Sequence, residues 1–224
     1  MRLGILEIHG IGEEKRRGFS AKRIALINKY SGKTFHILES HWGYITENQS
    51  DVVLNNRFPK EPLSPFKRAS FKAREFGLSF LSDTFQYEKG SRKRIQAHVL
   101  KDLECLLAHC DKVLLFGHSL GALIAYDLIR YLRPSLKERI AGLLTTGSPI
   151  PYFRYENIKD IKMPWLNIWE YSDFISMPTN RSFCDDYEWK DRKLFIGKTV
   201  ATHRRYRGSK KLAKLIVKYF KLGE

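Results

Sequence analysis

A serine flanked by glycines is the strongest candidate for chemistry in this chain. The pentapeptide Gly117-His118-Ser119-Leu120-Gly121 follows an apolar run, Lys112–Phe116, and precedes a helical pattern over Leu120–Leu132. A strand, a sharp turn and a helix in that order hold a serine out of the sheet, and glycine at either end of the turn avoids clashes with the neighbouring elements. Ser119 is therefore predicted to attack a carbonyl carbon. The His118 side chain is expected to point away from Ser119 and to be structural.

His203 is the only histidine that follows this serine in the chain. Hydrolases that carry their serine on such a turn place the acid and then the histidine later in the sequence. His203 lies between a short apolar stretch, Leu194–Ile196, which is expected to be the last strand, and a helical pattern that starts at Lys210. We therefore expect His203 to be the base that takes the serine proton.

Asp173 is the first choice for the acid among the ten carboxylates between the serine and the histidine. It directly follows an expected strand, Pro164–Tyr171, and the ligand sites of open α/β sheets lie at the carboxyl ends of strands. Its role would be to orient the base and to stabilise the imidazolium. Glu170, inside that strand, is the second choice. Asp185 and Asp186, in the loop that follows, are the third.

Two backbone N–H groups must face the oxyanion of a tetrahedral intermediate. The residue after the nucleophile supplies one of them, which here is Leu120 at the start of a helix. The loop after the first strand supplies the other, and His9-Gly10-Ile11-Gly12 stands at that place, so Ile11 is the candidate. An ordinary glycine-rich turn without chemistry is the alternative for this loop.

The rest of the pattern alternates short apolar runs with amphipathic stretches, which indicates an α/β protein with a mostly parallel sheet and helices on both faces. Further strands are expected at Leu3–His9, Thr34–Leu38 and Ile140–Thr145, and further helices at Ala21–Tyr30, Arg92–His109 and Lys210–Phe220. A chain of 224 residues suits a single domain, 1–224. Prolines interrupt residues 43–90, which are expected to form a cap or lid inserted in that domain.

These motifs resemble the lipase- and esterase-like branch of the α/β-hydrolase superfamily. The resemblance rests on His9-Gly10-Ile11-Gly12-Glu13, on the serine pentapeptide and on Thr146-Gly147-Ser148-Pro149. It extends to single residues further on: Asn167, Tyr171, Asp173, Pro178, His203 and Tyr206. Phe174 stands where the branch usually has proline. The match spans nearly the whole chain apart from residues 43–90, and it implies an α/β-hydrolase fold and a hydrolase of the lipase, esterase or thioesterase kind.

The chain is strongly basic, with a net charge of +16 from 40 Lys and Arg against 24 Asp and Glu. Such a surface attracts anionic partners. Arg204 and Arg205 adjoin the expected base and are candidates for binding an anionic group of a substrate, with simple solvent exposure as the alternative. Phenylalanines among basic residues between Phe66 and Phe85 suggest contact with an anionic membrane, although packing onto the domain is the simpler interpretation.

Together the motifs predict a serine hydrolase that cleaves a carboxylic ester of a small molecule or lipid, with no metal or organic cofactor. Thioester or amide cleavage by the same residues is one alternative. A catalytically silent basic module that binds nucleic acid or an anionic membrane is another, and the complete candidate triad argues against it. Three cysteines without a CxxC pair argue against a zinc site or a disulfide framework. No signal peptide or membrane span is recognised, so a cytoplasmic protein is expected.

Overall fold

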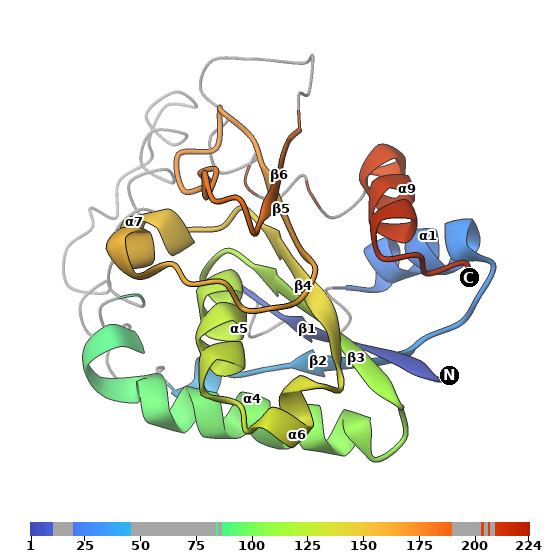
Figure 1. Cartoon of the computed structure of the whole chain (residues 1–224), viewed down its shortest axis with the longest axis horizontal. Coiled ribbons are helices and arrows are strands. Elements are labelled where there is room, and N and C mark those ends of the chain that lie inside the picture. The colour runs from blue at the N-terminus through green and yellow to red at the C-terminus, as the bar shows by residue number, and fades with distance from the viewer. Residues whose placement is uncertain (11–19, 46–83, 85–86, 190–202, 204–205, 207–208) are drawn as a thin grey trace, which may run out of the picture.

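A parallel β-sheet forms the centre of the molecule (Figure 1). The computed structural model describes residues 1–10, 20–45, 84, 87–189, 203, 206 and 209–224. Within them the sheet has six strands in the order β2-β1-β3-β4-β5-β6, and every neighbouring pair is parallel. The strands are β1 (Leu3–Ile8), β2 (His36–Ser40), β3 (Lys112–His118), β4 (Ile140–Thr146), β5 (Trp165–Trp169) and β6 (Asp185–Glu188).

Helices cover both faces of the sheet, as the alternating sequence pattern predicts. The α-helices are α1 (Ala21–Ser31), α4 (Arg92–Leu107), α5 (Leu120–Tyr131), α6 (Pro134–Lys137), α7 (Ile150–Arg154) and α9 (Lys210–Tyr219). Shorter turns of helix are η1 (Gly43–Ile45), η2 (Tyr87–Ser91) and η3 (Tyr155–Asn157). In Figure 1, α4 and α5 lie on one side of the sheet, and α1 and α9 lie together on the other.

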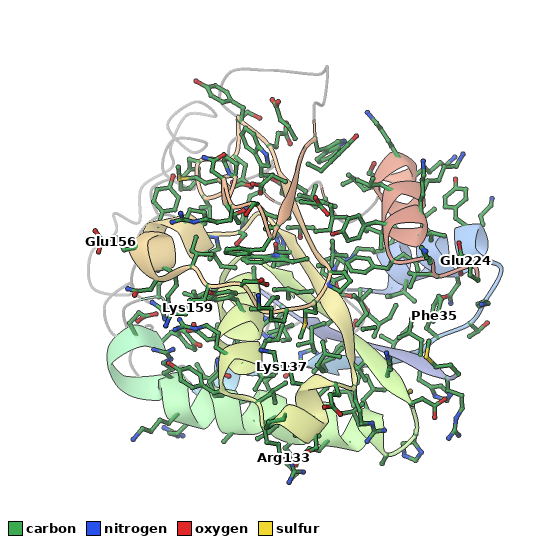
Figure 2. All side chains as sticks on the ribbon, viewed as in Figure 1. Phe35, Arg133, Lys137, Glu156, Lys159 and Glu224 are labelled. Atoms are coloured by element: carbon green, nitrogen blue, oxygen red, sulfur yellow. The ribbon has the colours of Figure 1, made fainter. Side chains whose placement is uncertain are left out.

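The central strand β3 is buried on both faces of the sheet. Its side chains alternate in direction, so Val113 and Leu115 pack in the core under α4 and α5, whereas Leu114 and Phe116 pack in the core under α1 and α9. All four are fully buried. A strand buried on both faces is a continuous apolar run, which is why Lys112–Phe116 is so easily recognised in the sequence. Figure 2 shows the side chains that fill the space between the sheet and its helices.

The sixth strand is a correction to the sequence prediction. Asp185 and Asp186 were expected in a loop, but they open β6, which pairs with β5 at the edge of the sheet. The acidic run Asp185–Glu188 lacks the apolar pattern of a buried strand because an edge strand exposes much of its surface. The expected strand Leu194–Ile196 lies outside the described residues. So does most of the expected cap, of which the structure describes η1, Thr84 and residues 87–90.

A buried carboxylate joins three segments on the face covered by α5. Asp127 of α5 is fully buried and accepts hydrogen bonds from the Tyr87 hydroxyl at 3.0 Å and from Arg154 at 2.8 and 3.2 Å. Arg92 lies 3.1 Å from the same carboxylate, and Arg154 also contacts Glu88 at 2.6 Å. The group therefore ties η2, α4 and α7 to α5 through a single side chain.

Replacing Asp127 by alanine is expected to lower the free energy of unfolding by about 1–3 kcal/mol, because the variant leaves the buried Tyr87 hydroxyl without its acceptor and the partly buried Arg154 with Glu88 as its counter-charge. Urea denaturation measures this loss. Asp160→Ala, which removes a carboxylate from a surface pair with Lys162, is the matched control and should change stability little. Equal stability of the Asp127 variant and the wild type would contradict the structural role of this carboxylate.

Candidate active site

The carboxyl ends of four neighbouring strands meet at one edge of the sheet. β1 leads into His9 and Gly10, β3 leads into Ser119, β4 leads into Gly147, and β5 leads toward Asp173. Their register keeps these ends level, since Ile8 pairs with Gly117. Because parallel strands end together, segments far apart in the sequence are brought side by side here.

Ser119 sits on a sharp turn between β3 and α5. Its backbone has φ 57° and ψ −129°, a strained conformation for a residue with a side chain. A Cβ on Gly117 would lie 2.5 Å from Ala122 Cα, and one on Gly121 would lie 2.1 Å from the carbonyl oxygen of Ile8. Only glycine fits at both ends of the turn, so the expected strand, turn and helix are confirmed.

The Ser119 hydroxyl lies against the loop that follows β1. A Cβ on Gly10 would come within 2.5 Å of Ser119 Cβ and 3.2 Å of Ser119 Oγ, so the glycine lets this backbone approach the serine. Within the described residues Ser119 Oγ is buried and makes no hydrogen bond. Leu120 opens α5, where the first backbone N–H groups have no partner inside the helix. The other candidate for the oxyanion hole, Ile11, lies outside the described residues.

His203 and Asp173 form a buried hydrogen-bonded pair. His203 Nδ1 lies 2.8 Å from Asp173 Oδ2, and both side chains are almost completely buried. The other carboxylate oxygen, Oδ1, accepts the backbone N–H of Ile175 at 3.1 Å. The two residues are 30 positions apart in the sequence and are joined only by the fold. An unprotonated Asp173 accepts the Nδ1 proton, which leaves Nε2 of His203 as the nitrogen able to accept another.

Tyr206 is a third partner of this pair that the sequence analysis placed in a family pattern without giving it a role. Its hydroxyl donates to Asp173 Oδ2 at 3.0 Å and lies 3.2 Å from Ser176 Oγ. Burial and the negative charge of Asp173 raise the pKa of the Tyr206 hydroxyl far above its usual value. The hydroxyl therefore keeps its proton and holds the carboxylate. Its spacing of three residues from His203 is the only signal in the sequence.

His118, expected to be structural, lies between β4 and the ring of His203. Its Nδ1 lies 3.1 Å from the carbonyl oxygen of Thr146 and 3.0 Å from Thr146 Oγ1. Its ring also lies against the ring of His203, with 4.7 Å between the centroids. Since His118 directly precedes Ser119, this contact brings the imidazole of His203 next to the turn that carries the serine.

The other carboxylates considered for the acid have different partners. Glu170 follows β5 rather than lying inside it, because the strand ends at Trp169, and it accepts the Ser172 hydroxyl at 2.9 Å. Asp185 accepts the Tyr219 hydroxyl at 2.6 Å. Asp186 accepts the side-chain amide of Asn167 on β5, the backbone N–H and hydroxyl of Thr179, and the backbone N–H of Asn180. Among the four candidates, Asp173 is hydrogen-bonded to Nδ1 of His203.

Arg204 and Arg205 lie outside the described residues. Among the residues that the structure describes, no group of three or more His, Cys, Asp or Glu side chains could hold a metal ion. The cysteines Cys105, Cys110 and Cys184 are free thiols, of which Cys110 and Cys184 are buried. No helix within the described residues is long and apolar enough to cross a membrane.

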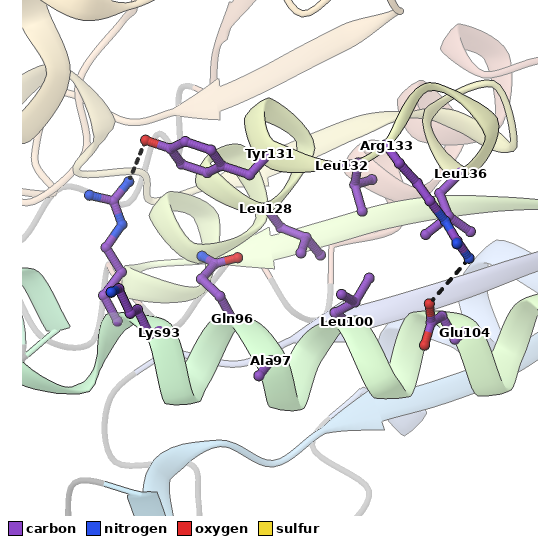
Figure 3. A pocket seen from close by; sticks show the side chains of 11 residues that line it. Lys93, Gln96, Ala97, Leu100, Glu104, Leu128, Tyr131, Leu132, Arg133 and Leu136 are labelled. Atoms are coloured by element: carbon purple, nitrogen blue, oxygen red, sulfur yellow. Dashed lines mark hydrogen bonds and ion pairs between the residues drawn. The ribbon is translucent and has the colours of Figure 1, made fainter.

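A cavity of about 720 Å³ lies between α4 and the second half of α5 (Figure 3). Leucines such as Leu100, Leu128 and Leu132 line it, and Lys93 and Glu104 stand at its rim. A helix rises about 1.5 Å per residue, so Leu128 is about 13 Å along α5 from the serine. This cavity is therefore separate from the edge of the sheet where Ser119, His203 and Asp173 lie.

The whole chain is similar in structure to a cutinase-like protein from Cryptococcus sp., with a TM-score of 0.50 and 10% sequence identity over 98% of this chain and 95% of that chain. At this level of identity the similarity concerns the fold. The chain has the α/β-hydrolase fold.

Two other solved structures are more distant. One is a predicted CIB-like hydrolase from Thermoplasma acidophilum, with a TM-score of 0.48 and 14% identity over 91% of this chain and 83% of that chain. The other is a provisionally assigned hydrolase of the α/β superfamily from Xanthomonas campestris, with a TM-score of 0.46 and 12% identity over 97% of this chain and 99% of that chain. No protein-family model and no curated protein matches the sequence.

Proposed function

We propose that this α/β-hydrolase-fold protein is a serine hydrolase that cleaves a carboxylic ester, with Ser119, His203 and Asp173 as its triad. The observation that carries the proposal is the buried hydrogen bond of 2.8 Å between His203 Nδ1 and Asp173 Oδ2, beside a serine held in a strained turn. A buried imidazole–carboxylate pair beside a strained serine is an arrangement that activates a serine hydroxyl.

In the first half of the proposed reaction Ser119 Oγ attacks the ester carbonyl carbon while His203 Nε2 takes the hydroxyl proton. The carbonyl oxygen becomes an oxyanion, and the backbone N–H groups of Leu120 and Ile11 are the proposed donors to it. His203 then gives its proton to the departing alcohol, and the acyl group remains on Ser119. Asp173 stays ionised and stabilises the imidazolium.

In the second half a water molecule attacks the acyl-enzyme. His203 accepts a proton from the water, and the tetrahedral intermediate collapses with release of the acid and return of the proton to Ser119 Oγ. The bond between serine and the acyl group breaks, so the enzyme is restored. Ser119 Oγ has no hydrogen bond in the described structure, which is compatible with this cycle because catalytic hydrogen bonds often tighten only when substrate is bound.

A fluorophosphonate probe tests the proposal, because it reacts covalently with an activated serine. The wild type should be labelled at Ser119, and Ser119→Ala should abolish labelling. Ser135→Ala, which removes an exposed serine of α6, is the matched control and should be labelled like the wild type. Failure to label the wild type, or labelling that survives Ser119→Ala, would contradict a serine hydrolase.

The ester class rests on the resemblance to lipases and esterases, and matched ester, thioester and amide substrates of increasing acyl length test it. Faster turnover of the ester of a small molecule or lipid supports the proposal, whereas a preference for the thioester or amide assigns the same triad to the alternative reaction. Salt-sensitive binding to DNA or anionic vesicles, with no turnover of any substrate, would favour the basic binding module suggested by the net charge of +16.

Tyr206→Phe is expected to slow labelling of Ser119 by about 10-fold, because it removes one of the hydrogen bonds that hold the Asp173 carboxylate. The substrate KM should stay close to the wild-type value, since Tyr206 acts through Asp173. Tyr131→Phe, on an exposed position at the end of α5, is the control. A wild-type labelling rate in Tyr206→Phe would show that the tyrosine hydroxyl is not needed to position the acid.

A further inference from the structure

We propose that His118 and Gly147 are positioning residues for the base. His118 packs against the imidazole of His203 and Gly147 leaves the space that this ring fills, and we call this packing arrangement the seat of His203. This inference rests on the proposed triad. It gives a reason for two motif positions that the proposed chemistry leaves unused: the residue before the nucleophile and the glycine of Thr146-Gly147-Ser148-Pro149.

The His118 ring is held in a fixed orientation by β4. Its Nδ1 lies 3.1 Å from the Thr146 carbonyl oxygen, and a carbonyl oxygen only accepts hydrogen bonds. Thr146 Oγ1, a hydroxyl that can donate or accept, lies 3.0 Å from the same nitrogen, so Nδ1 has a hydrogen-bond partner on Thr146 in either tautomer. Because His118 is also only 2% exposed, its ring is a rigid surface rather than a mobile side chain.

That rigid ring packs against His203. The two ring centroids are 4.7 Å apart, with 32° between the ring planes. The Tyr206 ring also lies near this contact, 5.9 Å from the His118 centroid. His203 is thus restrained by Asp173 at Nδ1 and by His118 against its ring. The hydrogen bond restrains the imidazole at one edge, and packing against His118 restrains the tilt of its ring plane.

Gly147 provides the space in which both imidazoles fit. It directly follows β4, and its backbone has φ 58°. A Cβ at this position would lie 2.8 Å from His203 Cε1 and 3.0 Å from His203 Nδ1, and 3.2 Å from His118 Cε1. The atoms it would strike belong to rings packed on several sides, so a methyl group here must displace His203 from its place beside Asp173.

Gly147→Ala is expected to slow fluorophosphonate labelling and ester turnover by about 10- to 100-fold, since a displacement of about 1 Å at the reacting groups has an effect of that size. The alanine also suffers from the positive φ, and Gly32→Ala is the control for that effect. Gly32 ends α1 with φ 68°, and a Cβ added there would meet no atom within 4 Å, so its variant carries the backbone strain without the clash. It should lose stability and keep its activity.

His118→Ala and His118→Phe separate the loss of the ring contact from other causes of a slower labelling reaction. Alanine removes the surface against which His203 packs and should slow labelling by about 10- to 100-fold. Phenylalanine keeps an aromatic ring at the same position but loses the hydrogen bond to Thr146, so it should restore part of the rate. Wild-type rates in His118→Ala or Gly147→Ala, or equal losses in His118→Ala and His118→Phe, would overturn the proposal.

Proton NMR supplies a readout that does not need catalysis. The Cε1–H resonance of His203, assigned by its disappearance in His203→Gln, should move in His118→Ala because the ring current of the neighbouring imidazole is lost. An unmoved resonance would overturn the seat. If the resonance moves but the wild type is not labelled, the seat stands and the proposed triad fails. If the wild type is labelled and His118→Ala reacts like it, the triad stands and the seat fails.

Discussion

Replacing His203 by glutamine is expected to lower kcat for ester hydrolysis by about 10⁶-fold, the size of effect seen when a triad residue that acts as part of a unit is removed. The physical reason is that a serine hydroxyl is a poor nucleophile unless its proton has an acceptor. Glutamine is similar in length and polar, yet it cannot take up a proton at neutral pH. Fluorophosphonate labelling of Ser119 should fall in parallel.

The comparison for this experiment is His109→Gln, which changes an exposed histidine just after α4. It should leave kcat unchanged, because His109 precedes the nucleophile and lies on the surface. Retention of most of the wild-type activity in His203→Gln would show that another group is the base, and the proposed triad would then fail at its second member.

Replacing Asp173 by asparagine is expected to lower kcat by about 10⁴-fold with little change in fold, because an amide in place of the acid favours the wrong tautomer of the histidine. The structure determines which way the amide would face. Ile175 N–H donates to Oδ1 at 3.1 Å, so this position needs an acceptor and must hold the amide oxygen. The NH₂ group then replaces Oδ2 and faces His203 Nδ1 and Tyr206.

An amide NH₂ can only donate, so it forces His203 Nδ1 to act as an acceptor and leaves the imidazole proton on Nε2. A protonated Nε2 cannot accept the proton of Ser119. Asp185→Asn is the matched control because Asp185 was a rival candidate for the acid and contacts Tyr219 instead. Steady-state kinetics decide between them: a larger loss of kcat in Asp185→Asn than in Asp173→Asn would contradict the assignment.

Much of the fold could be predicted from the sequence because most elements carry their own local signal. The apolar run Lys112–Phe116 corresponds to the first five residues of β3, and the helical pattern after Ser119 corresponds to α5. Helix ends were less predictable: the helix expected over Arg92–His109 ends at Leu107. β6 was missed since an acidic edge strand has no apolar alternation, and its place depends on pairing with β5.

The site could be predicted where a residue type is rare in the relevant part of the chain, or where the fold constrains the order of the catalytic residues along the sequence. Ser119 stands in a motif, and His203 is the only histidine after it. The acid was harder because ten carboxylates lie in the relevant interval, and only its place after an expected strand favoured Asp173 over Glu170, Asp185 and Asp186. Its contact with His203 arises from the fold, which brings the end of β5 and a residue beyond β6 together.

The sequence by itself determined the turn at Ser119, the two glycines that it requires, and the alternation of strands and helices, because these depend on sterics within a few residues. Only the tertiary structure decided which carboxylate meets His203, that Tyr206 holds this carboxylate, and that His118 packs against the base. Such contacts depend on the order and register of parallel strands, which set the distances between segments that are remote in the chain.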